Sequence, residues 1–418
     1  MGRLNEPTNE ASAMQKEISA IAEQGGGRAT KVEQLIQQYC PDGVEYKRLG
    51  DICKLARGTR VVKKDLSING AYPVYQNSLK PLGYYDQFNR AEETTFIICA
   101  GAAGDVGYSK VKFWSADDCF SVICPDTISN RYVFYCLLSQ QNRIYSQVRK
   151  ASIPRLSHSA VEALYIPVPP LPVQEEIVRI LDNFAELQAE LQAELQKRLQ
   201  QYNYYRDKLL SFNELNRGGQ SVSVEWKKLG EICLKVCSGG TPSRGNSGYF
   251  TGDIPWLRTQ EVDWKDIYDT EIKITEDAVK NSSAKLIPEN CVIIAMYGAT
   301  AGKVGINKIP LTTNQACCNL QINPQKALYK YVYYWVCNEY EHLKSLGQGS
   351  QNNINAQIIK EYPIPIPPLA EQQRIVDILD RFSTLTTDIT AGLPAEIEAR
   401  RKQYEYYRDQ LLTFKQKA

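Results

Sequence analysis

Apolar and polar positions follow different patterns in successive stretches of the chain. Short β-type runs such as AYPVYQ, TTFIICA and CFSVICP fill residues 44–167, with one helical run near 131–148. After a cluster of prolines at 167–172, apolar side chains recur at every third or fourth position from 177 to 209. We predict one helix here, on the order of 50 Å long, whose apolar face needs a partner helix because no small domain covers that length. This stripe is formed by Ile177, Leu181, Phe184, Leu187, Leu191, Leu195, Leu199, Tyr202, Tyr205 and Leu209.

The complete pattern occurs twice. The segment VEYKRLGDIC at 44–53 returns as VEWKKLGEIC at 224–233, and the proline-rich helix start at 165–184 returns at 363–382. The helix end YNYYRDKLLSF at 202–212 returns as YEYYRDQLLTF at 404–414. The second copy therefore offers the partner helix, and we expect an antiparallel pair. The alternative is two unrelated helices, each packed on its own domain.

The two copies are not identical. Gly392 and Pro394 interrupt the second stripe, which predicts a kink or a restart of the helix near 392–394. The second helix also has four more residues between Phe382 and Tyr404 than the first has between Phe184 and Tyr202. The expected twofold symmetry is therefore imperfect, and the break is the candidate adjustment.

The repeat predicts an α/β (α+β) fold with a pseudo-twofold internal repeat. Two globular domains would be separated by two long antiparallel helices that form a coiled coil. Residues 1–43 would contain two short helices split by glycines 25–27 and would meet the C-terminus. The expected parts are an N-terminal helical extension at 1–43, a first domain at 44–167, a first spacer helix at 168–213, a linker at 214–223, a second domain at 224–365 and a second spacer helix at 366–415.

A smaller repeat lies inside the first long helix. The tetrapeptide AELQ occurs in tandem at 185–188, 189–192 and 193–196. All four residue types favour helix, so composition alone is one explanation. The other is a ruler, because each copy adds about 6 Å of helix and turns its far end by about 40°.

Composition restricts the function classes. The chain has 418 residues and a net charge of +2, which is not the strongly basic balance of a lone nucleic-acid binder. Contact with DNA would need local patches or a partner protein. The 12 cysteines are scattered without CxxC, which favours reduced thiols in a cytoplasmic protein, and two histidines leave little material for zinc sites. No apolar run approaches the roughly 20 residues that span a bilayer, so we expect no membrane partner.

Glycine-rich turns at equivalent places raise the question of a nucleotide site. FIICAGAAGDVGYSK at 96–110 matches VIIAMYGATAGKVGINK at 292–308, but neither fits GxxxxGK[ST] or GxGxxG. We predict structural strand–turn–strand units with the glycines at positive φ. Since catalytic motifs of the common classes are absent as well, the sequence favours a non-catalytic protein.

Loops with Arg, Lys, Asn and Gln side chains occur at equivalent places in both copies. Arg pairs well with guanine and Asn or Gln with adenine, while Ser, Thr and Lys suit phosphates. We take these loops as candidate DNA-binding segments. The candidates in the first copy are Arg57, Arg60, Lys63, Lys64, Gln76, Asn77, Lys80, Arg155 and Ser157. Those in the second are Thr241, Ser243, Arg244, Arg258, Thr259, Gln260, Gln351, Asn352 and Asn353.

The duplicated IPxPPLxxQxxIVxILDxF stretch and the YYRDxLLxF tail resemble the repeated regions of specificity subunits of type I restriction–modification enzymes. The segments LGDICKLARGT and SGGTPSRGNSGYF resemble their target-recognition domains, and the tandem tetrapeptide resembles the type IC branch. The resemblance covers about residues 30–415.

This resemblance implies that each domain reads one half of a split, asymmetric sequence in double-stranded DNA. The helix pair would hold the domains apart and dock two modification subunits, with repeat number setting the gap between half-sites. It also implies that S-adenosylmethionine, ATP and magnesium belong to partner modification and restriction subunits, with no cofactor in this chain.

Two other functions stay open on the residues alone. One is a scaffold with two binding modules on a coiled coil that joins other proteins. The other is an enzyme that holds a nucleotide at the glycine turns.

Overall fold

The structure is a computed structural model that describes residues 30–67, 69–212, 224–347, 353–387 and 392–417. It divides into two compact units. Unit 1 comprises Met1–Leu191 and Ile397–Ala418, and unit 2 comprises Gln192–Glu396. The boundary at residues 191 and 192 falls inside the tandem AELQ repeat. Residues 1–29 of the N-terminal extension and the whole linker 214–223 lie outside the described residues.

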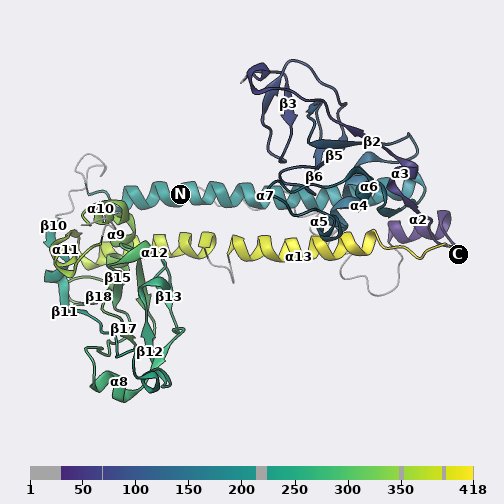
Figure 1. The fold of residues 1–418 in the computed structure, drawn as a ribbon. Coiled ribbons are helices and arrows are strands. Elements are labelled where there is room, and N and C mark those ends of the chain that lie inside the picture. Colours follow the sequence, from purple (N-terminus) through teal and green to yellow (C-terminus); the bar gives the residue numbers. More distant parts are fainter. Residues whose placement is uncertain (1–29, 68, 213–223, 348–352, 388–391, 418) are drawn as a thin grey trace. The chain divides into compact units, whose positions relative to one another are not determined.

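Unit 1 contains three small sheets and a set of short helices (Figure 1). A four-stranded antiparallel sheet has the order β2-β8-β5-β6, a three-stranded sheet has the order β4-β3-β7, and β1 pairs with β9. The strands are β1 Tyr46–Arg48, β2 Lys54–Arg57, β3 Tyr72–Tyr75, β4 Gly83–Tyr85, β5 Thr94–Ile98, β6 Val106–Ser109, β7 Trp114–Ser115, β8 Cys119–Ile123 and β9 Tyr165–Pro167. The helices are α2 Lys31–Tyr39, α3 Leu49–Ile52, α4 Asn130–Ser139, α5 Gln141–Ser146, α6 His158–Glu162 and the first part of α7 Leu171–Leu210.

Unit 2 has the same plan with an extra strand. Its sheets have the orders β11-β18-β15-β16-β13 and β14-β12-β17, and β10 pairs with β19. The strands are β10 Glu225–Lys228, β11 Cys233–Ser238, β12 Ile254–Leu257, β13 Asp266–Ile267, β14 Lys273–Ile274, β15 Val292–Ala295, β16 Val304–Asn307, β17 Thr312–Thr313, β18 Cys317–Ile322 and β19 Pro363–Ile366. The helices are α8 Glu276–Lys280, α9 Tyr329–Asn338, α10 Tyr340–Ser345, α11 Ala356–Glu361 and α12 Leu369–Thr387. Helix α13 Leu393–Leu411 follows and belongs mostly to unit 1.

The repeated sequence motifs make the same contacts in both units. In unit 1 the Tyr132 hydroxyl donates to the Pro167 carbonyl at 3.2 Å, and in unit 2 the Tyr331 hydroxyl donates to Pro365 at 2.8 Å. The hydroxyls of Tyr135 and Tyr334 donate in the same way to Asp182 and Asp380 of the long helices. These bonds fix α4 and α9 against the helix that follows each domain.

A second helix accompanies α7 within each unit. In unit 1, Phe184 stacks on Tyr407 of α13 with ring centroids 5.6 Å apart, and in unit 2 Phe382 of α12 stacks on Tyr205 at the same separation. The Phe414 carbonyl also accepts from Tyr46, whose strand pairs with the strand just before α7. Within unit 1, the residues after α13 lie near the strand that precedes α7, and Tyr407 lies beside Phe184, so the two helices run antiparallel there.

The break in the second helix occurs where glycine and proline predict it. Helix α12 ends at Thr387 and α13 begins at Leu393, with Pro394 in its first turn, where a missing N–H costs nothing.

The position of the buried leucine near the end of α7 differs from expectation by one residue. Leu210 is the fully buried residue near the end of α7, whereas Leu209 is half-buried. The predicted α+β class with an internal repeat is confirmed.

The C-terminus returns to the beginning of unit 1, as the repeat predicts. Val44 and Gln416 form a parallel bridge, in which the Val44 N–H donates to the Lys415 carbonyl at 2.8 Å. Helix α2, capped by reciprocal bonds between Thr30 and Glu33, packs beside this junction. None of the helices in the described ranges combines the length and apolar character needed to cross a bilayer.

Candidate nucleic-acid interface

Five loop segments of unit 1 meet at one edge of its sheets, which we call rim 1. Rim 1 comprises residues 57–71 apart from the undescribed residue 68, together with 76–81, 99–105, 115–118 and 147–157. The Thr59 N–H donates to the Ser115 carbonyl and the Ala102 N–H to the Asn77 carbonyl, both at 2.9 Å. The Leu156 N–H donates to the Cys99 carbonyl at 2.9 Å. These bonds between distant segments build one surface from five loops.

Unit 2 has the equivalent surface, rim 2, formed by residues 238–253, 258–263, 296–303 and 313–316 and by 346–347 with 353–354, the described part of a fifth segment. The Gly240 N–H donates to the Thr313 carbonyl at 2.9 Å, and the Ile354 N–H donates to the Met296 carbonyl at 2.8 Å. The Thr300 hydroxyl donates to the Thr259 carbonyl at 3.0 Å. Rim 1 and rim 2 thus share their backbone frame although their side chains differ.

Glycines allow the loops to approach so closely. A Cβ on Gly58 would lie 1.9 Å from the Ala116 carbonyl oxygen, and one on Gly239 would lie 1.9 Å from the Thr313 carbonyl oxygen. The turns carry Gly101, Gly104, Gly298 and Gly302 at positive φ, as predicted. The prediction was wrong for Gly107 and Gly305, which lie in strands β6 and β16 with ordinary φ, where neighbours crowd a side chain.

All nine candidates from the first copy lie in rim 1. The Nε of Arg57 donates to the Asp117 carbonyl at 3.1 Å, and Arg57 as a whole is exposed. Arg57 and Arg155 both act on the Cys99 thiol; burial and Asp118 raise its pKa to about 11, while the two arginines oppose that rise. Arg57 and Arg155 lie in the same rim although they stand 98 positions apart in the sequence. Ser157 has a structural role, since its hydroxyl caps α6 by accepting from the Ala160 N–H.

The candidates from the second copy lie in rim 2, apart from Gln351 and Asn352, which are outside the described residues. Arg244, Ser243 and Gln260 are exposed, whereas Thr241 bonds to Gln315. The Asn353 side-chain oxygen accepts from the Gly298 N–H at 3.3 Å. These contacts leave Arg244 as the exposed arginine of rim 2.

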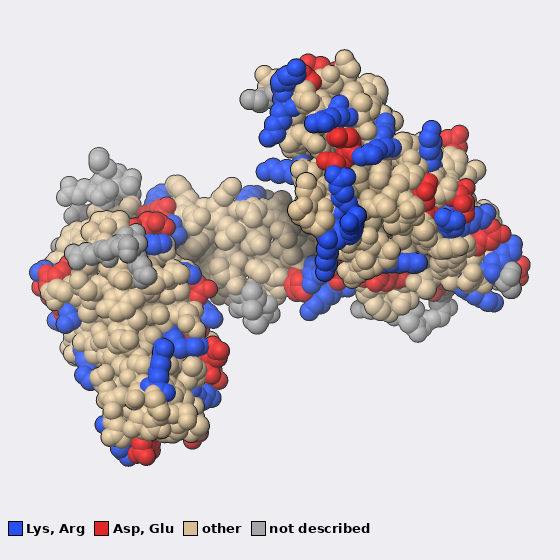
Figure 2. Space-filling view, viewed as in Figure 1, with Lys and Arg blue, Asp and Glu red and all other residues tan. Residues whose placement is uncertain are grey.

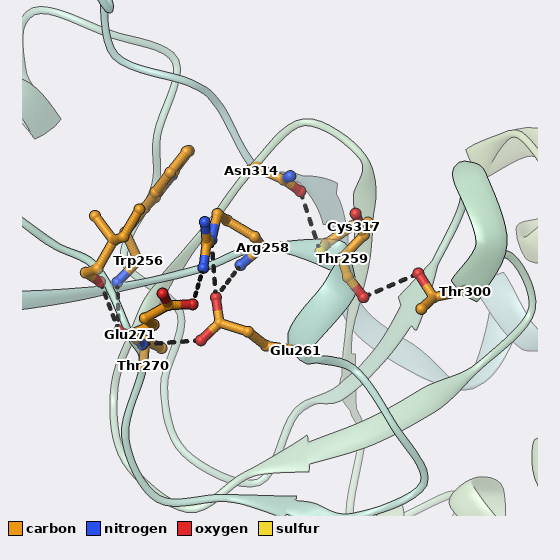
Figure 3. Close-up of polar contacts among 10 residues, drawn as sticks. Trp256, Arg258, Thr259, Glu261, Thr270, Glu271, Thr300, Asn314 and Cys317 are labelled. Atoms are coloured by element: carbon orange, nitrogen blue, oxygen red, sulfur yellow. Dashed lines mark hydrogen bonds and ion pairs between the residues drawn. The ribbon is translucent and has the colours of Figure 1, made fainter. Parts of the chain in front are cut away.

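Arg258 is held inside unit 2 by two carboxylates (Figure 3). Its Nε donates to Glu261 at 3.1 Å, its terminal nitrogen pairs with Glu271, and its backbone N–H also reaches Glu261. Glu261 in turn accepts from the Glu271 N–H at 2.9 Å. Arg258 therefore closes the loop 258–271 and is 20% exposed.

A hollow of about 390 Å³ adjoins Arg258. Trp256 forms part of its wall and donates its indole N–H to the Gly240 carbonyl at 2.9 Å. The residues that line it are Arg244, Ser247, Phe250, Trp256, Arg258 and Ile272. The hollow, which rim 2 partly forms, combines aromatic and basic groups, so a base or a phosphate fits its chemistry.

Sequence reasoning missed two residues of rim 1. Arg149 and Lys150 are exposed, and the backbone of Arg149 pairs with that of Arg155 through bonds of 2.8 and 3.2 Å. The signal was present in the run QVRKASIPR, whose two basic ends flank a proline turn.

The two rims together define a class of protein. Each presents Arg, Lys, Asn, Gln, Ser and Thr side chains on loops that a rigid frame positions, which is the chemistry of phosphate contact and base reading. Within the described ranges, no group of three or more His, Cys, Asp or Glu side chains is placed to hold a metal ion. The fold and its rims are those of a duplicated recognition protein.

Comparison with known families identifies the class further. The family model described as type I restriction modification DNA specificity domain matches residues 41–201 and 222–399, once for each half. The chain belongs to this family, the specificity subunits of type I restriction–modification systems.

Relatives match over almost the whole chain. The specificity subunit of EcoR124I/EcoR124II from Escherichia coli is 36% identical over 407 residues, which cover 89% of this chain and 94% of the relative. A putative specificity subunit from Haemophilus influenzae is 32% identical over 392 residues, covering 89% and 96%.

Solved structures confirm the fold. The S subunit of a type I system from M. genitalium has a TM-score of 0.60 at 18% identity, covering 88% of this chain and 96% of that one. A chain from a structural study of complex assembly and conformational transition in the type I system has a TM-score of 0.55 at 17% identity, covering 88% and 97%.

Proposed function

We propose that rim 1 and rim 2 each read one half of a bipartite, asymmetric DNA sequence. The observation that carries this proposal is the pair of rims with one backbone frame and two different sets of side chains. Thr59 and Gly240 make the same backbone bond in the two rims, yet Arg155 in rim 1 corresponds to Asn353 in rim 2. Because Arg suits guanine and Asn suits adenine, the two half-sites differ in sequence.

The chain itself acts without catalysis in this proposal. It directs two modification subunits, which carry S-adenosylmethionine, and restriction subunits, which use ATP and magnesium. The site chemistry supports this separation of recognition from catalysis, since the rims offer hydrogen-bond donors and acceptors on loops. The near-neutral net charge of +2 also supports shared contact with the DNA backbone.

We place the protein in the cytoplasm, where its DNA target is. The cysteines support this location, because all twelve are free thiols. The scaffold alternative predicts no DNA preference and the enzyme alternative predicts a bound nucleotide, so both are separable by experiment.

The test maps methylated adenines in the genome of cells that express the chain with its modification subunits. The expected result is one motif with two unlike half-sites and a fixed gap. A chimaera in which residues 224–365 come from another family member should change one half-site and keep the other. The matched chimaera, with residues 44–167 exchanged, should change the opposite half-site. Methylation without sequence preference would contradict the proposal and favour the scaffold.

A further inference from the structure

The charges of rim 1 and rim 2 are unequal. The five segments of rim 1 carry eight Lys and Arg against four Asp, a formal charge of +4. The five segments of rim 2 carry three basic and three acidic residues, a formal charge of zero. The basic residues of rim 1 are Arg57, Arg60, Lys63, Lys64, Lys80, Arg149, Lys150 and Arg155.

Ion pairing increases the difference in available positive charge between rim 1 and rim 2. All eight basic side chains of rim 1 are exposed, and in the described part of the chain none of them forms an ion pair. In rim 2, Arg258 is paired with Glu261 and Glu271, and Lys303 is paired with Asp263 at 2.6 Å. Arg244 is the exposed cation that remains in the described segments of rim 2.

One face of each unit shows how its basic side chains are distributed (Figure 2). In the view of Figure 2, Lys and Arg follow one side of unit 1 over β3, β5 and β6. The visible face of unit 2 is mainly uncharged, with basic side chains along its edges and one group near its middle. Exposed cations without a carboxylate partner are available to phosphates, whereas a paired one must first give up its partner.

We infer that rim 1 supplies most of the salt-dependent affinity for the DNA backbone, while rim 2 reads its half-site mainly through uncharged side chains. This inference rests on the proposed function and assigns phosphate contact mainly to unit 1. A counterion is released for each phosphate that a cation neutralises, so the logarithm of affinity falls with the logarithm of salt by about 0.9 for each contact. The two rims should therefore contribute unequally to the salt slope.

The test uses the complete complex with its modification subunits, whose own contacts stay constant. Binding to the mapped target DNA is measured by fluorescence anisotropy between about 50 and 200 mM salt. We compare two double variants of rim 1, R149Q/K150Q and K63Q/K64Q, with the double variant R244Q/R258Q of rim 2. The control is K54Q/K110Q, because Lys54 and Lys110 are exposed at the ends of β2 and β6 remote from rim 1.

The expected result is a slope reduced by about 2 for each rim 1 variant, below about 1 for R244Q/R258Q and unchanged for the control. If R244Q/R258Q does not fold, R244Q alone is expected to reduce the slope by no more than about 0.9. An equal or larger loss from the rim 2 variants would overturn the inference. An unchanged slope in R149Q/K150Q, with loss of a modification subunit from the complex, would overturn the inference and assign Arg149 and Lys150 to docking of that subunit.

This result is separate from that of the proposed function. The methylated motif of the control K54Q/K110Q, whose residues lie outside both rims, should be the same as that of the wild-type complex. A wild-type complex without sequence preference contradicts the proposed function, whereas equal salt slopes with a normal motif contradict the division of labour alone.

Discussion

Gln174 of unit 1 and Gln372 of unit 2 make the same hydrogen bonds. The Gln174 side-chain oxygen accepts from the Ser129 N–H at 2.9 Å, and its nitrogen donates to the Pro169 carbonyl at 2.7 Å. Gln372 accepts from Leu328 at 2.9 Å and donates to Pro367 at 2.8 Å. Both amides are fully buried. The glutamine of the repeated motif thus joins each long helix to the domain before it.

The substitutions Gln174→Leu and Gln372→Leu should each destabilise the protein. Each removes the partners of a buried N–H and a buried carbonyl, which costs about 1–3 kcal/mol for each group left unsatisfied. The midpoint of chemical unfolding followed by circular dichroism should fall for both variants. Gln373→Leu is the control, since Gln373 is exposed and surface changes stay within about 0.5 kcal/mol. An unfolding midpoint of Gln174→Leu equal to that of the control would show that these bonds add no stability.

The long helices follow from the apolar periodicity, and their antiparallel pairing follows from the repeat. Phe184 belongs to the first apolar stripe and Tyr407 to the repeated helix end at 404–414, and their rings stack in the structure. The middle of the stripe behaves differently, because Leu187, Leu191 and Leu195 are only half-buried. Heptad-like spacing reveals which face is apolar, but it does not reveal how completely a neighbour covers it.

The rims were predictable only in part. Loops that carry Arg and Asn at equivalent places indicated the segments, and Arg57 with Arg155 lie in one rim. Which side chains stay free depends on contacts between distant residues, such as Arg258 with Glu271 thirteen residues away. The capping role of Ser157 was not predictable either, because the local sequence does not distinguish a serine that caps a helix from one that contacts DNA.

Glu176 should make the stability of unit 1 dependent on acid pH. Its side chain is 5% exposed and pairs with Arg179 and Lys31, both at 2.8 Å. Hydrogen bonding to Arg179, and then to Lys31, lowers the pKa of the Glu176 carboxyl, while burial opposes this shift. A lowered pKa in the folded state means stability that is present above the unfolded value of about 4.3 and is lost as pH falls through the folded pKa.

The variant Glu176→Gln measures this contribution. At pH 7 its unfolding midpoint should lie below that of the wild type, and the difference should disappear as pH falls below about 4. Glu186→Gln is a matched control, because Glu186 is exposed on the same helix. A difference between wild type and Glu176→Gln that stays constant from pH 7 to pH 3 would contradict the assignment.

Gly58 and Gly239 allow each rim to be disturbed separately. Alanine at either position places a Cβ 1.9 Å from a carbonyl oxygen, so the loop must move. Gly58→Ala should weaken reading of the half-site assigned to rim 1, and Gly239→Ala that of rim 2. Competition binding with DNA altered in one half-site measures both. Gly245→Ala should leave both half-sites unchanged, because its Cβ lies 3.7 Å from the nearest atom. Equal weakening of both half-sites by either variant would mean that the rims are not independent.

The tandem AELQ repeat lies within one continuous helix, α7, and spans the boundary between the two units. Removal of residues 189–192 shortens that helix by about 6 Å and turns its end by about 40°. The deletion should leave both half-sites intact and shorten the preferred gap by about one base pair, the rest of the step being absorbed by tilt. Methylation mapping of cells that carry the deletion measures the half-sites and the gap together. A double substitution of the same segment without loss of length, E190K/Q192E, should keep the original gap because Glu190 and Gln192 are exposed. An unchanged gap in the deletion, or altered half-site sequences, would show that the repeat does not act as a ruler.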